Sequence, residues 1–301
     1  GKEIAFMGKT YTVEEATFDS FKGIDIALFA GGSISKDFAP HAVKAGAVVI
    51  DNSSAFRMDP EVPLVVPEVN PQAILKHKGI IANPNCSTII MVMALKPIYD
   101  LAKIKRVIVS TYQAVSGAGK EGIDELDAQV REHSEGREMT ANILPSSSAE
   151  KHYPIAFNLI PQIDVFCDNL YTKEEMKMVN ETKKIMEDYE MRITATTIRV
   201  PVYRSHSESV NIELEKEVDL GAMREALAKF PGVTVQDDPS KQEYPMPLYT
   251  SEKDDVYVGR LRRDESCEKS YNMWVVGDQI RKGAALNTLQ IAETMIKNGW
   301  I

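Results

Sequence analysis

The chain has 301 residues, which is long enough for two domains of ordinary size. Hydrophobic residues make up 44% and charged residues 26%, as in typical soluble globular proteins, and no apolar run is long enough to cross a bilayer. The formal net charge of −9 argues against nucleic acid or an anionic membrane surface as a partner, so an anionic ligand would need specific Arg and Lys side chains.

Apolar strands and a helix alternate in the first part of the chain. We expect a short strand pair at 3–7 and 10–13, a helix at about 35–44, and further strands at 24–29, 47–50, 64–66 and 79–82. Buried apolar strands that alternate with helices predict a Rossmann-like parallel sheet. Ligands at such sheets bind beyond the carboxyl ends of the strands, which is the position of Gly31, Gly32, Asn52, Ser53 and Asn83.

The pattern changes after a long apolar helix that we expect at about 87–101. Longer, alternating strands are expected at 106–112, 192–202, 209–215, 256–262 and 271–276, with helices near 122–131, 173–189 and 220–230. This mixture predicts an α+β second domain with a mixed or antiparallel sheet. An amphipathic helix at 282–298 ends the chain.

Cys86 is the cysteine with informative surroundings. The segment 80–88 predicts a strand, a tight turn and a helix, which places Cys86 at or beside a helix N-terminus. Free N–H groups and the positive end of the helix dipole favour a thiolate there and could hold an oxyanion. A small buried residue at an element boundary is the other interpretation, and both stay open at this point. Cys167 is interpreted as structural and Cys267 as an exposed loop residue.

Three segments together resemble signatures of the aspartate-β-semialdehyde dehydrogenase family in its bacterial form. They are Asn83-Pro84-Asn85-Cys86-Ser87-Thr88, the segment 110–119 and the segment 200–208. They occur in the family's order with similar separations, and the resemblance covers essentially the whole chain. One such motif is a weak signal, whereas the three together are specific.

The resemblance implies NADPH-dependent reductive dephosphorylation of L-4-aspartyl phosphate to the semialdehyde through a Cys86 thioester. It implies that His206 is the acid/base and that Gln113 orients the substrate at the sulfur. Considered alone, a histidine on a strand is more often structural, and His152 is the serious rival.

The resemblance also implies the substrate-binding residues. Arg199, seven residues before His206, would bind the carboxylate, because a planar guanidinium suits it. Arg57 would bind phosphate with help from Asn85. Glu174 and Lys177 share one face of a predicted helix and would bind the substrate amine and phosphate, although such a pair is usually a solvated surface pair.

The cofactor implied is NADP. The segment 117–122 satisfies G-x-G-x-x-G, but it lies in the second domain and we expect no parallel βαβ unit with a suitably spaced acid after it. The resemblance places this loop at the nicotinamide end instead. The family's Gly-rich fingerprint should precede Gly1, so we expect an N-terminally incomplete first domain. The remaining candidate contacts are Gly31, Gly32, Asn52, Ser53, Ser116, Gly117 and Gln279.

The resemblance implies a dinucleotide-binding domain at 1–85 and 283–301 and a catalytic and dimerisation domain at 86–282. It also implies a homodimer or homotetramer, and a product that feeds lysine, methionine, threonine and diaminopimelate biosynthesis. Three sparse cysteines without metal-ligand spacing predict a reducing, cytoplasmic setting and no metal.

Three alternatives stay open. An N-acetyl-γ-glutamyl-phosphate reductase uses the same thioester chemistry, but its acylated substrate gives Glu174 no ammonium to bind. A glyceraldehyde-3-phosphate-type dehydrogenase has different surroundings of the cysteine. A non-catalytic dimerising or regulatory paralogue would not be expected to retain Cys86, Gln113, Arg199 and His206 together.

Overall fold

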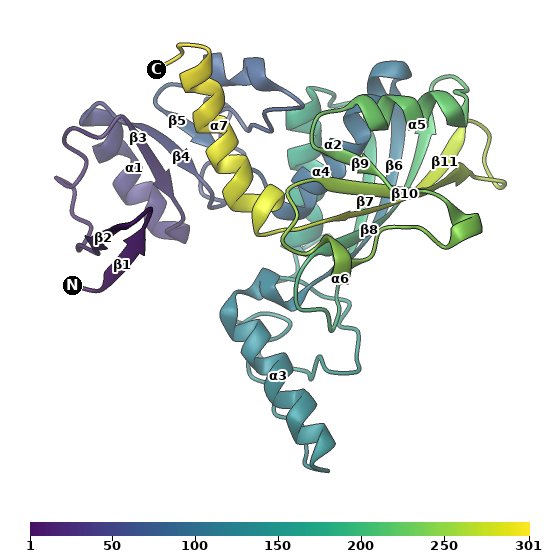
Figure 1. Cartoon of the computed structure of the whole chain (residues 1–301), viewed down its shortest axis with the longest axis horizontal. Helices are drawn as coiled ribbons and strands as arrows, with labels where there is room; N and C mark the ends of the chain where they lie inside the picture. Colours follow the sequence, from purple (N-terminus) through teal and green to yellow (C-terminus); the bar gives the residue numbers. More distant parts are fainter.

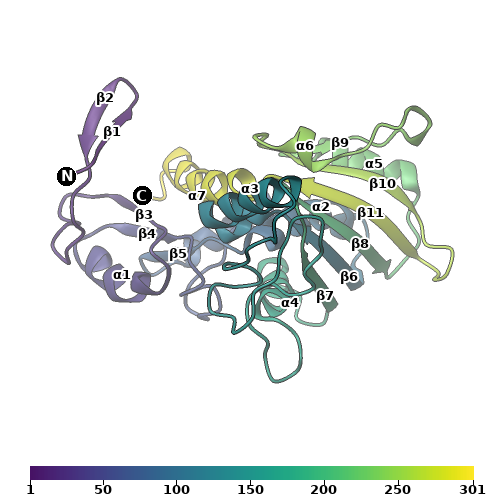
Figure 2. The same cartoon turned by 90° about the horizontal axis from the view of Figure 1, so that it is seen from below.

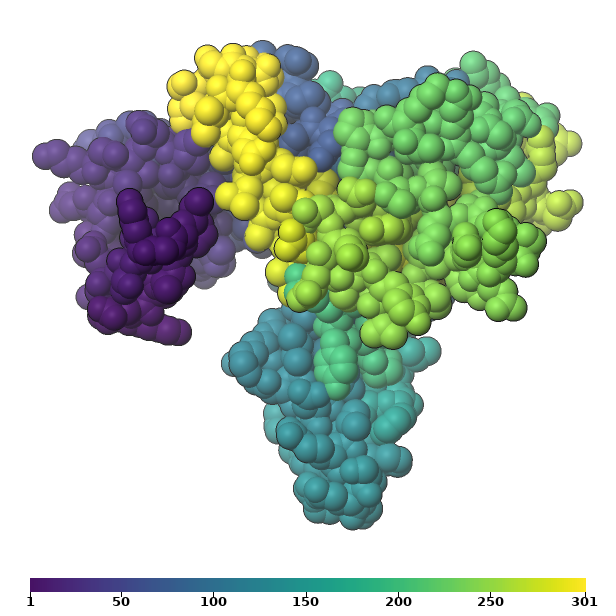
Figure 3. Space-filling view, in the orientation of Figure 1, coloured from purple at the N-terminus to yellow at the C-terminus, as the bar shows by residue number.

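The computed structural model describes all of residues 1–301 and divides them between two lobes of unequal size. Figure 1 shows β1 to β5 and α1 in the smaller lobe and a broad sheet in the larger one, with α7 returning from the larger lobe to the smaller. A limb that contains α3 projects from the larger lobe, and the space-filling view in Figure 3 shows it standing clear of the rest. None of the helices combines the length and the apolar character that crossing a membrane requires.

The smaller lobe is built on three short parallel strands in the order β3-β4-β5, as the apolar runs predict. Their bounds are β3 Ile26–Phe29, β4 Val48–Asp51 and β5 Ile80–Ala82. The expected helix is α1, Ser35–Lys44, whose buried alanines pack on β4. Parallel strands place their carboxyl ends at one edge of the sheet, so the loops after β3, β4 and β5 share that edge.

The strand expected at 64–66 was wrong. Leu64 makes a single parallel bridge to Ala82 although the segment is buried. Prolines at 63 and 67 remove backbone donors on both sides of the run. The Asn70 side chain takes two of the remaining backbone groups, accepting from Val66 N–H at 2.9 Å and donating to Leu64 O at 2.9 Å. The segment therefore bends instead of continuing as a strand.

The expected strand pair at the start of the chain is an antiparallel hairpin of β1, Glu3–Phe6, and β2, Lys9–Thr12. Figure 2 shows it projecting from the smaller lobe. All eight strand residues are exposed, so the hairpin contributes nothing to the core.

The larger lobe holds a six-stranded mixed sheet in the order β7-β6-β8-β11-β10-β9. β6 and β7 are parallel, as are β9 and β10, and the other neighbours are antiparallel. The bounds are β6 Ile104–Gln113, β7 Arg192–Arg199, β8 His206–Leu214, β9 Val233–Val235, β10 Val256–Arg263 and β11 Ser270–Gly277. The mixed sheet was predicted, although β7 ends three residues before the expected Val202.

Three helices cover one face of this sheet and form the main core with it. They are α2, Cys86–Leu101, α4, Lys173–Met186, and α5, Leu220–Lys229. The central helix is α2, whose run Ile89–Leu95 is fully buried. A helix that is apolar on all sides must be enclosed by protein, and its N-terminus is thereby fixed against the sheet.

The limb and the last helix complete the fold. The limb holds α3, Lys120–Ser134, and a small core of its own that includes Leu126, Leu144 and Ile155. The last helix is α7, Leu286–Lys297, preceded by a π-helical turn at Arg281–Ala285. Short helical turns lie at Gly32–Ile34, Pro71–Lys76, Val115–Ala118, Pro239–Lys241 and Pro247–Thr250.

Helix α7 packs on the smaller sheet. Its Ile291 and Met295 form one buried cluster with Ile50 of β4 and Ile81 of β5. The C-terminal helix therefore contacts the first lobe, as the resemblance implied. The division of the chain into domains at 85 and 282 stays a prediction.

Candidate active site

Four neighbouring strands of the larger sheet meet one row of residues that faces the N-terminus of α2, where β6, β7 and β11 end and β8 begins. In the strand register Gln113 of β6 pairs with Arg199 of β7, and His206 of β8 pairs with Gly277 of β11. The three polar side chains are at most 3% exposed. The chain thus brings together at one sheet edge the three residues that the sequence singled out, with Arg199 and His206 on different strands, β7 and β8.

Cys86 is the first residue of α2, and its sulfur meets this row. Its Sγ lies 3.5 Å from His206 Nε2. On the far side of the ring, Ala114 N–H donates to Nδ1 at 3.1 Å. This bond fixes the ring so that Nε2 faces the sulfur, and in the neutral tautomer that it favours the proton lies on Nε2.

The backbone bends immediately before His206. Ser205 has φ +76, in the left-handed region that non-glycine residues rarely adopt. Its N–H donates to Gln279 Oε1 at 2.8 Å, and its hydroxyl lies 2.7 Å from Thr250 Oγ1. These contacts hold a strained residue beside the histidine, a pattern typical of functional sites.

The protonation of this pair differs from the expectation. Burial raises the pKa of the Cys86 thiol to about 12, with the Glu174 carboxylate acting in the same sense and Arg57 and Arg199 opposing it. Burial also lowers the pKa of His206 well below its usual range, and Arg199 adds to the effect. The expected thiolate was wrong for the free site, because desolvation at the buried helix end outweighs the positive end of the helix dipole.

The turn before Cys86 is held from several sides. Asn85 is the N-cap of α2, and its Oδ1 accepts from Thr88 N–H at 3.2 Å. Its Nδ2 donates to Glu174 Oε1 at 2.9 Å, and its backbone N–H donates to Glu181 Oε2 at 2.6 Å. The nucleophile's turn is therefore fastened to α4.

Glu174 is the centre of a buried polar cluster, and not part of the solvated surface pair that its spacing from Lys177 usually indicates. It is 5% exposed and accepts from Asn85, from Gln113 Nε2 at 3.2 Å and from Lys177 Nζ at 3.2 Å. Burial opposes its ionisation, but Lys177 and the amide donors outweigh burial and hold its pKa below the usual range. Lys177 also bonds Asp164 Oδ2 at 3.0 Å.

Arg199 has one partner in the chain and a free side. Its Nη1 donates to Ala114 O at 2.7 Å, whereas its buried Nε has no partner. The loop at Gly117 lies against it. A Cβ at Gly117 would be 2.6 Å from Arg199 Nη1 and 3.4 Å from His206 Nε2, so the glycine keeps this approach open.

Arg57 reaches the site from the smaller lobe and is 8% exposed. Its Nε donates to Asn83 O at 2.9 Å, its Nη2 to Asn52 O at 3.0 Å, and its Nη1 to Glu181 Oε1 at 3.2 Å. Three of the five guanidinium N–H groups are thus used, and two remain for an anion.

The candidate cofactor residues lie in two groups. Gly31 and Gly32 are exposed at the start of the helical turn before α1, and Asn52 and Ser53 follow β4 at the same sheet edge. The second group is at the larger sheet, where Gln279 Nε2 donates to Ser116 Oγ beside Gly117. Both ends of the Gln279 amide are bonded within the protein, so it orders two loops.

One reason given against a dinucleotide fingerprint at 117–122 was wrong. β6 and β7 do run parallel, with α3 and α4 between them. The loop nevertheless faces Arg199 and His206, because it crosses the end of the catalytic row.

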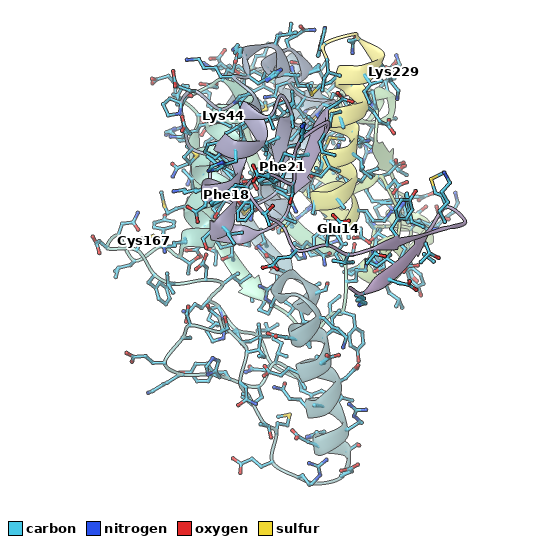
Figure 4. All side chains as sticks on the ribbon, turned by 90° about the vertical axis from the view of Figure 1, so that its left-hand side faces the viewer. Glu14, Phe18, Phe21, Lys44, Cys167 and Lys229 are labelled. Atoms are coloured by element: carbon cyan, nitrogen blue, oxygen red, sulfur yellow. The ribbon has the colours of Figure 1, made fainter.

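The rival residues lie elsewhere. His152 Nε2 lies 3.1 Å from Ser146 O in the limb and takes no part in the row. Cys167 is partly exposed on a loop that Figure 4 shows at the edge of the molecule, and Cys267 is exposed, as expected. No group of three or more His, Cys, Asp or Glu side chains is arranged to hold a metal ion.

Two further residues contact the site although the sequence did not single them out. Glu181 is 1% exposed and bonds both Arg57 and the Asn85 backbone. Gly283, in the π-helical turn before α7, lies so close that a Cβ there would be 3.0 Å from Cys86 Cβ. The seven-residue step from Glu174 to Glu181, two helical turns, was the available signal for the first, whereas the second depends on contacts between distant segments.

Comparisons with known proteins agree over the whole chain. Residues 1–77 match a model of the semialdehyde dehydrogenase NAD binding domain, and residues 95–282 match one of the semialdehyde dehydrogenase dimerisation domain. The chain is 57% identical to the aspartate-semialdehyde dehydrogenase of Aquifex aeolicus, covering 100% of this chain and 88% of that protein. It is 53% identical to the aspartate-semialdehyde dehydrogenase of Bacillus subtilis, over 99% of this chain and 86% of that protein.

A solved structure is similarly close. The crystal structure of aspartate semialdehyde dehydrogenase II from Vibrio cholerae, complexed with ASA, matches with a TM-score of 0.91 and 46% identity. The match covers 99% of this chain and 87% of that one. The resemblance drawn from three short motifs thus extends to sequence and fold throughout.

Proposed function

Because the chain belongs to the aspartate-semialdehyde dehydrogenase family, and so is an oxidoreductase with a nicotinamide-binding domain, we propose that it reduces L-4-aspartyl phosphate to L-aspartate 4-semialdehyde with NADPH. The observation that carries the mechanism is the 3.5 Å approach of Cys86 Sγ to His206 Nε2, inside a ring of buried charges.

The first step is acyl transfer to Cys86. Sγ attacks the carbonyl carbon of the acyl phosphate, the carbon–oxygen bond to phosphate breaks, and a thioester forms. The thiol proton leaves with the phosphate, so charge and atoms balance. The N–H groups at the start of α2 lie where they can stabilise the negative oxygen of the intermediate.

The second step reduces the thioester. When bound, the nicotinamide cofactor supplies the hydride that the carbonyl carbon accepts. His206 Nε2 lies beside the reacting sulfur, so it exchanges protons with the sulfur and with the neighbouring oxygen as the carbon–sulfur bond breaks. The aldehyde leaves, and Cys86 returns to the thiol with one proton that is taken from solvent and passed on by His206.

The charged side chains match the groups of the substrate. Arg199, with its free Nε, binds the carboxylate, and the ionised Glu174 binds the ammonium. Arg57 and Lys177 bind the phosphate with help from Asn85. Gln113, bonded to Glu174, orients the carbonyl at the sulfur.

The first-lobe edge fits a dinucleotide. Gly31 and Gly32 open the turn before α1, where free N–H groups suit a diphosphate. The nearby Ser35 Oγ is buried without a partner, as a group that awaits a ligand would be. Asn52 and Ser53 lie at the same edge, and Ser116 and Gly117 lie at the catalytic row. NADP as the preferred cofactor follows from the family resemblance.

The alternative reductase of N-acetyl-γ-glutamyl phosphate would use the same cysteine chemistry. Its substrate carries no ammonium, so the buried, ionised Glu174 would lack a positive partner from the substrate. The aspartyl substrate removes that mismatch. We therefore rank the reduction of aspartyl phosphate above that of N-acetyl-γ-glutamyl phosphate.

We further propose that the enzyme is a homodimer or homotetramer of the cytoplasm. The dimerisation-domain match over 95–282 supports assembly. All three cysteines are unpaired, which suits a reducing compartment.

The direct test is a spectrophotometric assay of the purified enzyme with L-aspartate semialdehyde, NADP and phosphate. We expect NADPH to form only when phosphate is present. The N-acetylglutamate analogue and NAD serve as parallel reactions. Preference for the acetylated aldehyde would contradict the substrate assignment, and preference for NAD would contradict the cofactor assignment.

A further inference from the structure

Helix α4 carries another buried carboxylate that contacts the site, Glu181, seven residues beyond Glu174 on the same helical face. It is 1% exposed, and both of its oxygens are occupied. Oε1 accepts from Arg57 Nη1 at 3.2 Å, and Oε2 accepts from the Asn85 backbone N–H at 2.6 Å. One side chain thus contacts the arginine from the smaller lobe and the residue that precedes the nucleophile.

The same helix holds the backbone around Arg57. Lys184 Nζ donates to the carbonyl oxygens of Arg57, Asp59 and Val62 at 2.7 to 2.8 Å. Helix α4 therefore grips the loop at its main chain and at its guanidinium group. The contact through Glu181 is the one that continues to the Cys86 turn.

We propose that Glu181 is a positioning residue for the reaction. It sets the angle of the Arg57 guanidinium and the place of the Cys86 turn with a single carboxylate, so that the phosphate site and the nucleophile keep a fixed separation. The inference rests on the proposed function in one respect, namely that Arg57 binds the phosphate.

The chemistry of the contact requires a carboxylate. Both partners are N–H donors, so both positions need an acceptor, whereas an amide offers one acceptor oxygen and places its own donor against the other partner. The carboxylate also balances the charge of a buried guanidinium. A neutral isostere should therefore loosen one of the two contacts while leaving the shape of the helix unchanged.

The experiment compares Glu181→Gln with Glu175→Gln. Glu175 is the matched control, because it is a buried carboxylate on the same helix that also holds two backbone N–H groups, those of Thr172 at 2.7 Å and Thr197 at 3.0 Å, away from the reacting sulfur. Steady-state kinetics give the KM for phosphate and for the semialdehyde. Hydrogen exchange of the segment 83–88 reports the Asn85 amide.

We expect Glu181→Gln to raise the KM for phosphate about tenfold or more, to change the KM for the semialdehyde far less, and to speed exchange of the Asn85 amide by about tenfold. Glu175→Gln should leave all three near the wild-type values while lowering thermal stability. If the Gln variant does not fold, Glu181→Asp keeps the charge but shortens the reach, and the same readouts should move in the same direction.

Equal values for the Glu181 and Glu175 variants in both measurements would overturn the inference and leave the proposed function standing. A wild-type enzyme without phosphate-dependent turnover would instead contradict the proposed function. Exchange of the Asn85 amide would then decide alone whether Glu181 positions the turn.

Discussion

The edges of the two sheets that carry the candidate site residues differ in how exposed those residues are. At the larger sheet Gln113, Arg199 and His206 are buried and held by hydrogen bonds. At the smaller sheet Gly31 and Gly32 are exposed and carry no side chain at all. Covalent chemistry needs reacting atoms held to within a fraction of an ångström, whereas a dinucleotide must enter and leave. The site residues of the larger sheet are therefore held rigidly where bonds would form, whereas the glycines of the smaller sheet leave space for a ligand to enter and leave.

The most severe way to break the buried side is Cys86→Ser. A hydroxyl keeps the size of the thiol but is a far weaker nucleophile near neutral pH, so we expect phosphate-dependent turnover to fall by at least about a thousandfold. Steady-state assays measure the loss, and circular dichroism checks that the fold is intact. Retained turnover would show that no thioester forms.

A pair of glycine variants tests the contrast itself. Gly117→Ala places a methyl group 2.6 Å from Arg199 Nη1, so we expect kcat/KM for the semialdehyde to fall by roughly a hundredfold. Gly32 has φ +65 and open space around its Cβ position, so Gly32→Ala should mainly lower stability, by about 1 kcal/mol. Kinetics and thermal unfolding of both variants separate the effects. Equal kinetic damage in both would contradict the division between a rigid and an open edge.

Most of the fold could be predicted because periodicity and turn residues act locally. Helix α1 begins and ends where expected, and the Cys86 turn follows from the strand and helix around it. The strand expected at 64–66 failed because Asn70 takes its backbone groups through a contact that no periodicity records. In the site, motifs identified the residue types, but they could not show that Glu174 is buried or that Glu181 joins Arg57 to the Cys86 turn.

Motifs do not reveal the ionisation of the site either, and Glu174→Gln tests how Glu174 affects the pKa of the Cys86 thiol. The Glu174 carboxylate is one of the groups that raise the pKa of the Cys86 thiol. Removing its charge should lower that pKa, so more thiolate exists at a given pH. We expect alkylation of Cys86 by iodoacetamide to become several-fold faster in the free enzyme.

Glu175→Gln is the control, because it removes a charge from the same helix at a residue that does not contribute to the shift. In the wild type the alkylation rate should still be rising above about pH 9, since burial holds the thiol protonated. A rate that levels off near neutral pH would show that the helix dipole prevails over burial after all.

Glu208, in the buried part of the larger sheet, is a carboxyl group whose burial should lower the free energy of unfolding. It lies two residues after His206 on β8, pairs with Thr111 and Val275, and is fully buried with both oxygens unpartnered. Burial raises its pKa well above the usual 4.5. The carboxyl of the folded chain therefore stays protonated over a range of pH in which the unfolded chain is already ionised.

Because of this difference in pKa, the free energy of unfolding depends on pH through Glu208. Below the unfolded pKa both states are protonated and the residue has no pH-linked cost. As the pH rises above it, ionisation favours the unfolded state, and stability falls until the folded pKa is reached. Glutamine cannot ionise, so Glu208→Gln should raise the free energy of unfolding by about 1 kcal/mol at about pH 8, and the gain should vanish below about pH 4. Denaturant unfolding at both pH values measures this change.

Glu213→Gln, farther along the same strand, gives the opposite sign and completes the test. Its carboxylate lies 3.2 Å from Arg192 Nη2 and 3.3 Å from Lys105 Nζ near the surface. Loss of this exposed pairing should lower stability by at most about 0.5 kcal/mol at neutral pH. If Glu208→Gln also destabilised the protein at about pH 8, the Glu208 carboxyl would have to be satisfied and charged in the folded state, and the buried row would be better paired than its protein contacts indicate.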